Sequence, residues 1–164
     1  MEGVAVPSVP VSGTWLRHTP AGAGPLGRPP VPADGRWQRG TVIEGIYLAA
    51  EESTVWAEWY RWLAEHEVEP LRSLPRELWR YRANLRKVAD LTSTATLTAL
   101  ELPTSEPNRE QWPAFQRAGE QLHAEASRVC CIAQRHGRGE CVCACSGTSS
   151  PPRRASSRCR PRNE

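Results

Sequence analysis

Residues 47–63 read YLAAEESTVWAEWYRWL, and two different patterns meet within this stretch. The letters GIYLAA at 45–50 form a compact apolar run, which is typical of a strand. The next three residues, EES at 51–53, supply negative charge and a hydroxyl able to cap, which favour the start of a helix. We therefore expect a strand that leads directly into an amphipathic helix ending near His66.

The expected helix carries one acid among its tryptophans. Val55, Trp59 and Trp62 recur at helical spacing and form the centre of an apolar stripe. Glu58 is three residues from Val55 and four from Trp62, so it lies on the flank of that stripe. There its carboxylate can point along the core surface toward the residues that precede the helix. The alternative is a surface acid that pairs with Arg61.

The chain on either side of this stretch alternates strand and helix patterns. GTWLRH at 13–18 predicts a short strand, and the Pro- and Gly-rich passage at 19–35 is longer than an ordinary connection, as functional loops often are. Alternating apolar residues at 77–85 predict a half-buried strand, and 111–125 has the spacing of a second amphipathic helix. A weaker helix ended by Pro103 is expected between them. We expect an α+β (mixed α/β) fold with a small mixed sheet and flanking helices.

Bulk properties set broad limits on the kind of protein. The chain has 164 residues and a net charge of +3, which suits one domain and neither demands nor excludes a nucleic-acid partner. No run approaches the roughly 18 apolar residues of a membrane span, and the start lacks the basic segment and long apolar core of a secretory signal. We expect a cytoplasmic protein without direct nucleic-acid binding.

The composition changes abruptly near residue 128. All seven tryptophans lie before residue 116, and all six cysteines lie after residue 129. From residue 128 onward there are eight arginines against two acids, and no Leu or aromatic residue occurs. A segment so poor in bulky apolar side chains cannot bury much surface. We therefore expect one domain at 13–127, with disordered segments at 1–12 and 128–164.

Three further side chains are candidates for a binding site. Arg36, in DGRWQRG at the end of the long loop, can clamp a phosphate through its planar guanidinium, and the alternative is a solvated arginine. Arg17 ends a strand with apolar neighbours, which favours a role for its guanidinium. Tyr47 lies in an apolar strand, where a tyrosine is more often a core residue than a substrate platform.

The order of these residues resembles the RES domain family, the toxin halves of RES–Xre toxin–antitoxin pairs in bacteria. The motifs TWLRH, DGRW, IYLA and the AE of the helix occur in the family's order, and they contain Arg17, Arg36, Tyr47 and Glu58. His18 stands where a tyrosine is commoner. Two later stretches, LPRELWRYRANLRKVADLT and WPAFQRAGEQLHAE, are also similar to family segments, so the resemblance covers roughly 13–125.

The resemblance implies a fold related to ADP-ribosyltransferases and an activity that cleaves the nicotinamide–ribose bond of NAD, with phosphate or water as acceptor. It also implies an Xre-type helix-turn-helix antitoxin as partner. Departure of nicotinamide leaves positive charge on the ribose, which the carboxylate of Glu58 can stabilise. Arg17 and Arg36 can bind the pyrophosphate or an incoming phosphate, and Tyr47 can stack on a flat ring or bond to a ribose hydroxyl.

The sequence departs from the family pattern after the helix at 111–125. The family continues with an apolar strand, a PSAR-like stretch carrying its named serine and a closing strand, whereas this chain reads EASRVCCIAQRHGRGECVCACSG. Ser127 comes too early and Ser146 lacks the context, so no serine is assigned. A shifted reading frame in GC-rich DNA would yield such a tail. On that hypothesis the sheet loses one or two strands and exposes an edge.

Two other interpretations remain open. The first is a catalytically inactive RES-derived protein that retains only partner binding, since the family serine is not found. The second is a basic, Cys-rich tail that acts as a nucleic-acid or metal module. Cys141, Cys143 and Cys145 form a C-x-C-x-C run instead of the paired C-x-x-C sets of zinc sites, so we expect no metal. Disulfides are not expected in a cytoplasmic chain.

Overall fold

The computed structural model describes residues 5–27, 33–43, 45–104, 108–126, 130–135 and 138–144. Its elements are, in chain order, β1 (Ser8–Pro20), β2 (Gly45–Ala49), α1 (Glu52–Glu65), η1 (Pro70–Ser73), β3 (Arg76–Asp90), α2 (Thr94–Ala99), η2 (Arg109–Gln111), α3 (Trp112–Ala126), β4 (Cys130–Arg135) and β5 (Arg138–Ala144). The five strands close into one barrel in the order β1–β2–β5–β4–β3. None of the helices in these ranges is both long and apolar enough to cross a membrane.

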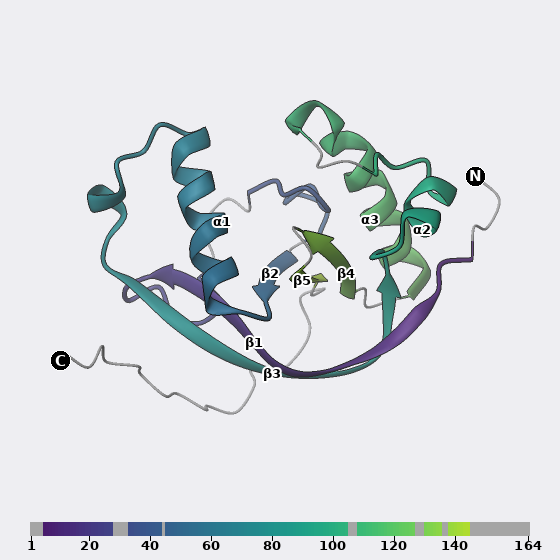
Figure 1. Cartoon of the computed structure of the whole chain (residues 1–164), viewed down its shortest axis with the longest axis horizontal. Helices are drawn as coiled ribbons and strands as arrows, with labels where there is room; N and C mark the ends of the chain where they lie inside the picture. The colour runs from purple at the N-terminus through teal and green to yellow at the C-terminus, as the bar shows by residue number, and fades with distance from the viewer. Residues whose placement is uncertain are drawn as a thin grey trace.

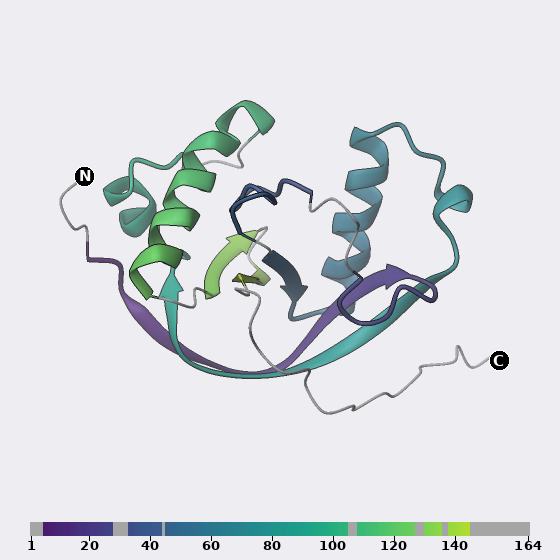
Figure 2. The same cartoon turned by 180° about the vertical axis from the view of Figure 1, so that it is seen from behind.

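The longest strands, β1 and β3, form a curved ribbon along the base of the molecule (Figure 1). α1 stands over one end of this ribbon, and α2 and α3 stand over the other. The view from behind shows β2, β4 and β5 between these two groups of helices (Figure 2). β3 and β4 run parallel, and the other strand pairs are antiparallel. The predicted α+β fold with a mixed sheet and flanking helices is confirmed.

The ribbon extends beyond the two strands predicted for it. β1 pairs with β3 from Ser8 opposite Ala89 to Pro20 opposite Arg76, so β1 begins inside the segment 1–12 that we expected to be disordered. The predicted alternation in β3 is present, because the apolar positions from Trp79 to Leu85 are half-buried and the polar positions between them are exposed. Backbone hydrogen bonds between β1 and β3 explain the extension, because they stabilise strand residues whose side chains bury little surface.

Two strands follow α3, where we expected the loss of strands. β5 pairs with β2 from Ala144 opposite Gly45 to Glu140 opposite Ala49, and β4 lies between β5 and β3. The expectation rested on the absence of Leu and aromatic residues, whereas these segments carry Cys, Val and Ile, which are also among the most often buried residue types. The edge expected to be exposed is therefore paired. Ser127, residues 145–164 and the cysteine side chains lie outside what the structure describes.

The helices lie close to their predicted positions, with one difference at the start of α1. Glu51 takes the N-cap position there, and Ser53 Oγ donates to the Glu51 carboxylate at 3.2 Å. The hydroxyl therefore supports the acidic turn and is not itself the cap. The weaker helix, α2, is capped by Ser93, whose Oγ accepts from the Thr96 backbone N–H at 3.0 Å.

The buried face of α1 is rotated relative to the predicted stripe. Val55, Trp59 and Leu63 are buried, whereas Trp62 is 47% exposed. Trp62 lines a cleft and does not enter the core. The core face of the helix is therefore marked by Val55, Trp59 and Leu63, each four residues after the one before. Trp62 belongs to the neighbouring side, which faces the cleft.

A second core cluster joins α3 to the loop that precedes β2. The Trp37 side chain is 3% exposed and meets the Phe115 ring edge-on at a centroid distance of 5.0 Å. The Trp37 backbone crosses α3 at Gly119, where a Cβ atom would collide with the Trp37 carbonyl oxygen. Gly119 therefore allows this loop to lie directly on the helix.

Replacing Gly119 with alanine tests this packing. In an ordinary helix interior the change would stabilise by about 0.5–1 kcal/mol. Here we expect Gly119→Ala to lower the free energy of unfolding by about 1–3 kcal/mol, because the loop backbone must move. Urea unfolding measures the effect. Arg117→Ala, at an exposed position of the same helix, should change stability by less than about 0.5 kcal/mol, and a Gly119→Ala variant as stable as wild type would contradict the prediction.

Candidate functional site

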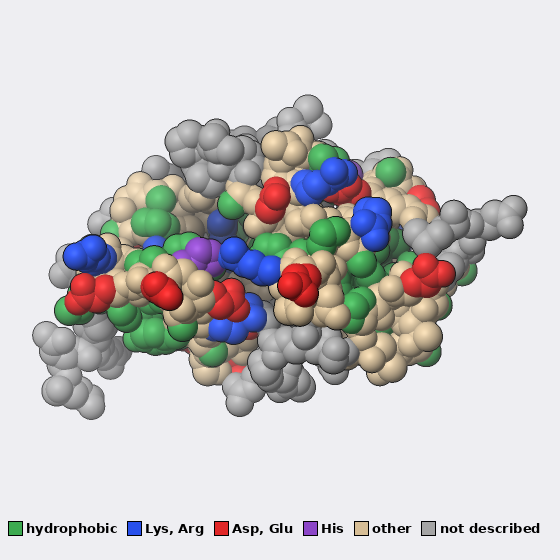
Figure 3. Space-filling view, turned by 90° about the horizontal axis from the view of Figure 1, so that it is seen from above, with side chains coloured by type: hydrophobic (Ala, Val, Ile, Leu, Met, Phe, Trp, Pro, Cys, Tyr) green, Lys and Arg blue, Asp and Glu red, His purple; other side chains and the backbone are tan. Residues whose placement is uncertain are grey.

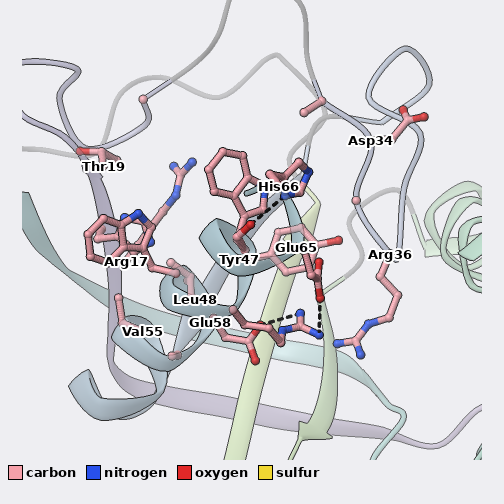
Figure 4. A pocket seen from close by; sticks show the side chains of 18 of the residues that line it. Arg17, Thr19, Asp34, Arg36, Tyr47, Leu48, Val55, Glu58, Glu65 and His66 are labelled. Carbon is pink, nitrogen blue, oxygen red and sulfur yellow. Dashed lines mark hydrogen bonds and ion pairs between the residues drawn. The ribbon is translucent and has the colours of Figure 1, made fainter. Parts of the chain in front are cut away.

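A cleft of about 820 Å³ is lined by β1, the loop around Arg36, β2, α1, the start of β3, η2 and the start of α3. Its volume falls in the range of small-molecule sites. The four residues selected from the sequence all line it, namely Arg17, Arg36, Tyr47 and Glu58. In Figure 4, Arg17 and Arg36 lie toward opposite sides of the view, with Tyr47 and Glu58 between them. The structure therefore brings together residues that are up to 41 positions apart, from 17 to 58.

Glu58 is held by a neighbouring arginine on the same helix. Arg61 Nη2 donates to Glu58 Oε2 at 3.0 Å, and Arg61 Nη1 lies 3.3 Å from Glu65 Oε1 (Figure 4). Glu58 lines the cleft, and its side chain is 30% exposed. The pairing with Arg61 that we considered as an alternative is therefore present, and it occurs within the cleft.

Tyr47 fastens the loop that carries Arg36. The Tyr47 hydroxyl donates to Gln38 Oε1 at 2.8 Å and accepts from the Trp37 backbone N–H at 3.2 Å. Gln38 is buried, and Gly35 lies so close to the Tyr47 hydroxyl that a Cβ atom there would collide with it. The position of Arg36 at the cleft is thus set by a tyrosine on β2.

α3 fixes the same loop from its other side. Gln116 Nε2 donates to the Gly35 carbonyl at 2.9 Å, and Arg39 makes a bidentate pair with Glu120 at 2.8 and 2.6 Å. The hydrogen bonds from Arg39 lower the pKa of the Glu120 carboxyl. Because both β2 and α3 hold this loop, the Arg36 backbone has little freedom to move.

Arg17 is tied to the first part of the long loop. Its Nη1 donates to the Leu26 carbonyl at 2.6 Å and to the Pro25 carbonyl at 3.3 Å. The Tyr81 hydroxyl also donates to the Pro25 carbonyl, and burial raises the pKa of Tyr81. Arg17 therefore both lines the cleft and folds the loop over the ribbon.

His18 and Arg76 form a second feature of the cleft, which the sequence analysis did not identify. Arg76 donates from Nε and Nη2 to His18 Nδ1 at 3.1 and 2.7 Å. The imidazole stacks on Trp56 at 5.6 Å and meets Trp59 edge-on at 5.9 Å. Burial, followed by the charges of Arg76 and Arg17, lowers the pKa of His18 to about 4. The sequence offered one signal for Arg76, which is its position directly before the predicted strand at 77–85. Arg17 had been selected for a comparable position at the end of another predicted strand.

The mouth of the cleft is bridged by another histidine–arginine contact. Arg109 Nη2 lies 2.5 Å from His66 Nε2, and His66 Nδ1 lies 2.8 Å from the Trp62 carbonyl. The Trp62 and His66 rings stack at 4.4 Å, and the Arg109 guanidinium lies 5.3 Å from the Trp112 ring. Figure 3 shows the molecule from above, and acidic and basic side chains are interspersed on this face. The contact joins the end of α1 to the turn before α3.

The charge of the lining is predominantly positive. Five arginines and three acids line the cleft: Arg17, Arg36, Arg61, Arg76 and Arg109, with Asp34, Glu58 and Glu65. Two of the acids share Arg61. Among the residues that the structure describes, no cluster of His, Cys, Asp or Glu is arranged to hold a metal ion. The lining therefore suits an anionic organic molecule.

Comparison with protein families places the whole chain. A model of the RES domain matches residues 3–157, so the chain belongs to the RES domain family. The match extends past both boundaries of the 13–127 domain expected from the sequence. No curated protein matches the chain.

A solved structure shares the fold. It is a chain in the crystal structure of the M. tuberculosis MbcT–MbcA toxin–antitoxin complex, with a TM-score of 0.69 and 19% sequence identity. The alignment covers 84% of this chain and 76% of that chain. At this identity the likeness establishes the fold alone.

Titration of His18 makes the stability of the fold depend on pH. The native pKa of about 4 lies below the ordinary value near 6.5, so the unfolded chain takes up the proton first as the pH falls. The contribution of His18 is complete above about pH 6.5 and is lost as the pH falls toward 4. We expect stability to decrease between about pH 7 and pH 5 more steeply in wild type than in His18→Leu, by urea unfolding. Equal slopes would contradict this.

Proposed function

We propose that this protein is a cytoplasmic RES toxin that destroys NAD by cleaving its nicotinamide–ribose bond, in a fold of the ADP-ribosyltransferase type. The observation that carries the proposal is the meeting of Arg17, Arg36, Tyr47 and Glu58 in one cleft of about 820 Å³. Membership of the RES family supports the same conclusion. Each of the four residues contributes a chemistry that this reaction needs.

Glu58 is the residue to which we assign stabilisation of the transition state. When the bond between nicotinamide and ribose breaks, its electron pair leaves with the base and the sugar carries positive charge. A carboxylate beside that sugar lowers the barrier electrostatically, and it is most effective when its position is fixed in advance. The bond from Arg61 supplies that fixation. An oxygen of water or phosphate then bonds to the sugar carbon that nicotinamide has left.

Arg17 and Arg36 supply positive charge for the phosphates. Guanidinium groups match the geometry of phosphate oxygens through paired N–H donors. Arg36 is carried by the loop that Tyr47 and α3 hold, which favours binding because little backbone freedom remains to be lost. Tyr47 contributes in two ways on this proposal, through its ring at the cleft and through its hydroxyl on the loop.

We further propose that an Xre-type helix-turn-helix antitoxin binds this protein and silences it. The structural relative comes from a toxin–antitoxin complex, which supports an antitoxin as the class of partner. The mixed charges around the mouth of the cleft provide a polar surface on which such a partner can be recognised (Figure 3).

Turnover of NAD by Glu58→Gln tests the assigned reaction. We expect wild type to release nicotinamide, and Glu58→Gln to do so about 10²–10³-fold more slowly, because the charge facing the sugar is removed. Chromatography of nicotinamide and of the ribosyl product, with and without inorganic phosphate, measures the rate and identifies the acceptor.

Glu52→Gln is the matched control for that experiment. Glu52 lies at the start of the same helix, is exposed, and accepts from Trp56 Nε1 at 3.0 Å, which a glutamine oxygen can also do. Its rate should equal that of wild type. Equal rates for wild type and Glu58→Gln would refute the role of Glu58. A folded wild-type protein that leaves NAD intact would favour the catalytically inactive, partner-binding alternative.

Inhibition by the antitoxin is a separate prediction. Co-expression with a helix-turn-helix protein encoded beside this chain should yield a stable complex on size-exclusion chromatography. Addition of that protein to the purified toxin should stop NAD loss at a stoichiometry set by the complex. Separate elution of the two proteins, with NAD loss unchanged, would show that this candidate is not the partner.

A further inference from the structure

Arg76 lines the cleft but has no role in the reaction as proposed above. It is the first residue of β3, and the antiparallel register pairs Pro20 with Arg76 and His18 with Leu78. His18 and Arg76 are therefore diagonal neighbours on one face of the ribbon, where long side chains can meet. The strand pairing itself thus places this arginine beside the imidazole.

The Arg76 guanidinium is fixed from two sides. Its Nε and Nη2 both point at His18 Nδ1, and its Cζ lies 5.7 Å from the centre of the Trp59 ring. Because Nδ1 accepts these bonds, the imidazole is neutral and carries its proton on Nε2. Stacking on Trp56 holds the imidazole in turn. An arginine fixed in this way loses little conformational entropy when it binds a ligand.

Among the described residues, no carboxylate forms an ion pair with Arg76. In the ranges that the structure describes, the ion pairs of the cleft join Arg61 to Glu58 and Glu65, and none involves Arg76 or Arg17. Burial and the positive charge of Arg17 lower the pKa of Arg76. Two arginines that interact without a counter-ion favour the binding of an anion between or beside them. The guanidinium also has N–H donors beyond the two directed at His18.

We propose that Arg76 binds the diphosphate of a dinucleotide substrate together with Arg17, and that His18 and Trp59 position it for this task. The planar fork of the guanidinium suits two phosphate oxygens at once. His18 acts only through Arg76 and is a positioning residue. Naming the ligand as part of a dinucleotide rests on the proposed function, whereas the binding of diphosphate by Arg76 does not.

Binding of inorganic pyrophosphate to the full chain tests the inference without turnover. Isothermal titration calorimetry should show binding to wild type and a loss of at least about tenfold in affinity for Arg76→Gln. Arg82→Gln is the matched control, because Arg82 lies on the same strand, is exposed and does not line the cleft. Its affinity should stay within about twofold of wild type. Equal affinities for Arg76→Gln and wild type would overturn the proposal.

Variants of His18 separate positioning from general stability. The Oδ1 atom of Asn can occupy the place of Nδ1 and accept from Arg76, so His18→Asn should keep pyrophosphate affinity within about threefold of wild type. His18→Leu removes the acceptor and should weaken binding about as much as Arg76→Gln. Equal affinities for the Asn and Leu variants would overturn the positioning role. If Arg76→Gln does not fold, Arg76→Lys carries the test, since it keeps the charge without the fork, and unchanged affinity would again overturn the proposal.

Two further measurements keep this inference distinct from the proposed function. With NAD as substrate, Arg76→Gln should raise KM more than it lowers kcat, in contrast to Glu58→Gln. If wild type leaves NAD intact, and Arg76→Gln still binds pyrophosphate more weakly than wild type does, the proposed reaction is refuted and the anion site stands. If Arg76→Gln weakens orthophosphate binding and leaves pyrophosphate binding unchanged, the assignment to a diphosphate is overturned.

Discussion

The cleft depends on the antiparallel pairing of β1 with β3. Two strands of 13 and 15 residues, paired along most of their length, make a curved ribbon whose ends carry different helices (Figure 1). At one end the register brings Arg17 opposite Trp79 and His18 diagonal to Arg76, and α1 packs over the same end. A slip of one residue would send each of these side chains to the other face. The arrangement of charge in the cleft therefore follows from backbone hydrogen bonding.

The opposite wall of the cleft is built on a different principle. The segment that carries Arg36 has no long strand or helix of its own, and it is held by side chains from two elements. From β2, the Tyr47 hydroxyl donates to Gln38 of this segment. From α3, Gln116 donates to the segment's backbone, and Gly119 lets that backbone lie directly on the helix. The site thus joins a wall fixed by sheet geometry to a wall fixed by a few specific hydrogen bonds.

The sequence revealed the features that are local and missed those that depend on pairing. Periodicity located α1 and α3, and alternation located β3, because both signals lie within one segment. Trp62 was assigned to the core because spacing alone cannot distinguish a cleft from an interior. β4 and β5 were missed because their stabilising contacts are hydrogen bonds to β2 and β3, which composition does not record. The partnership of His18 with Arg76 spans 58 positions and required the register of the ribbon.

Closure of the sheet limits how a partner protein can attach. β5 and β4 complete the ring between β2 and β3, and β5 pairs with β2 along all five residues of that strand. At β2, recruitment of a foreign strand by β-augmentation, a common route to peptide recognition, would require displacement of β1 or β5. A partner that approaches this part of the barrel therefore meets side chains instead of a free strand edge, and sequence changes on those surfaces can alter recognition without disturbing the pairing of β2 with β5.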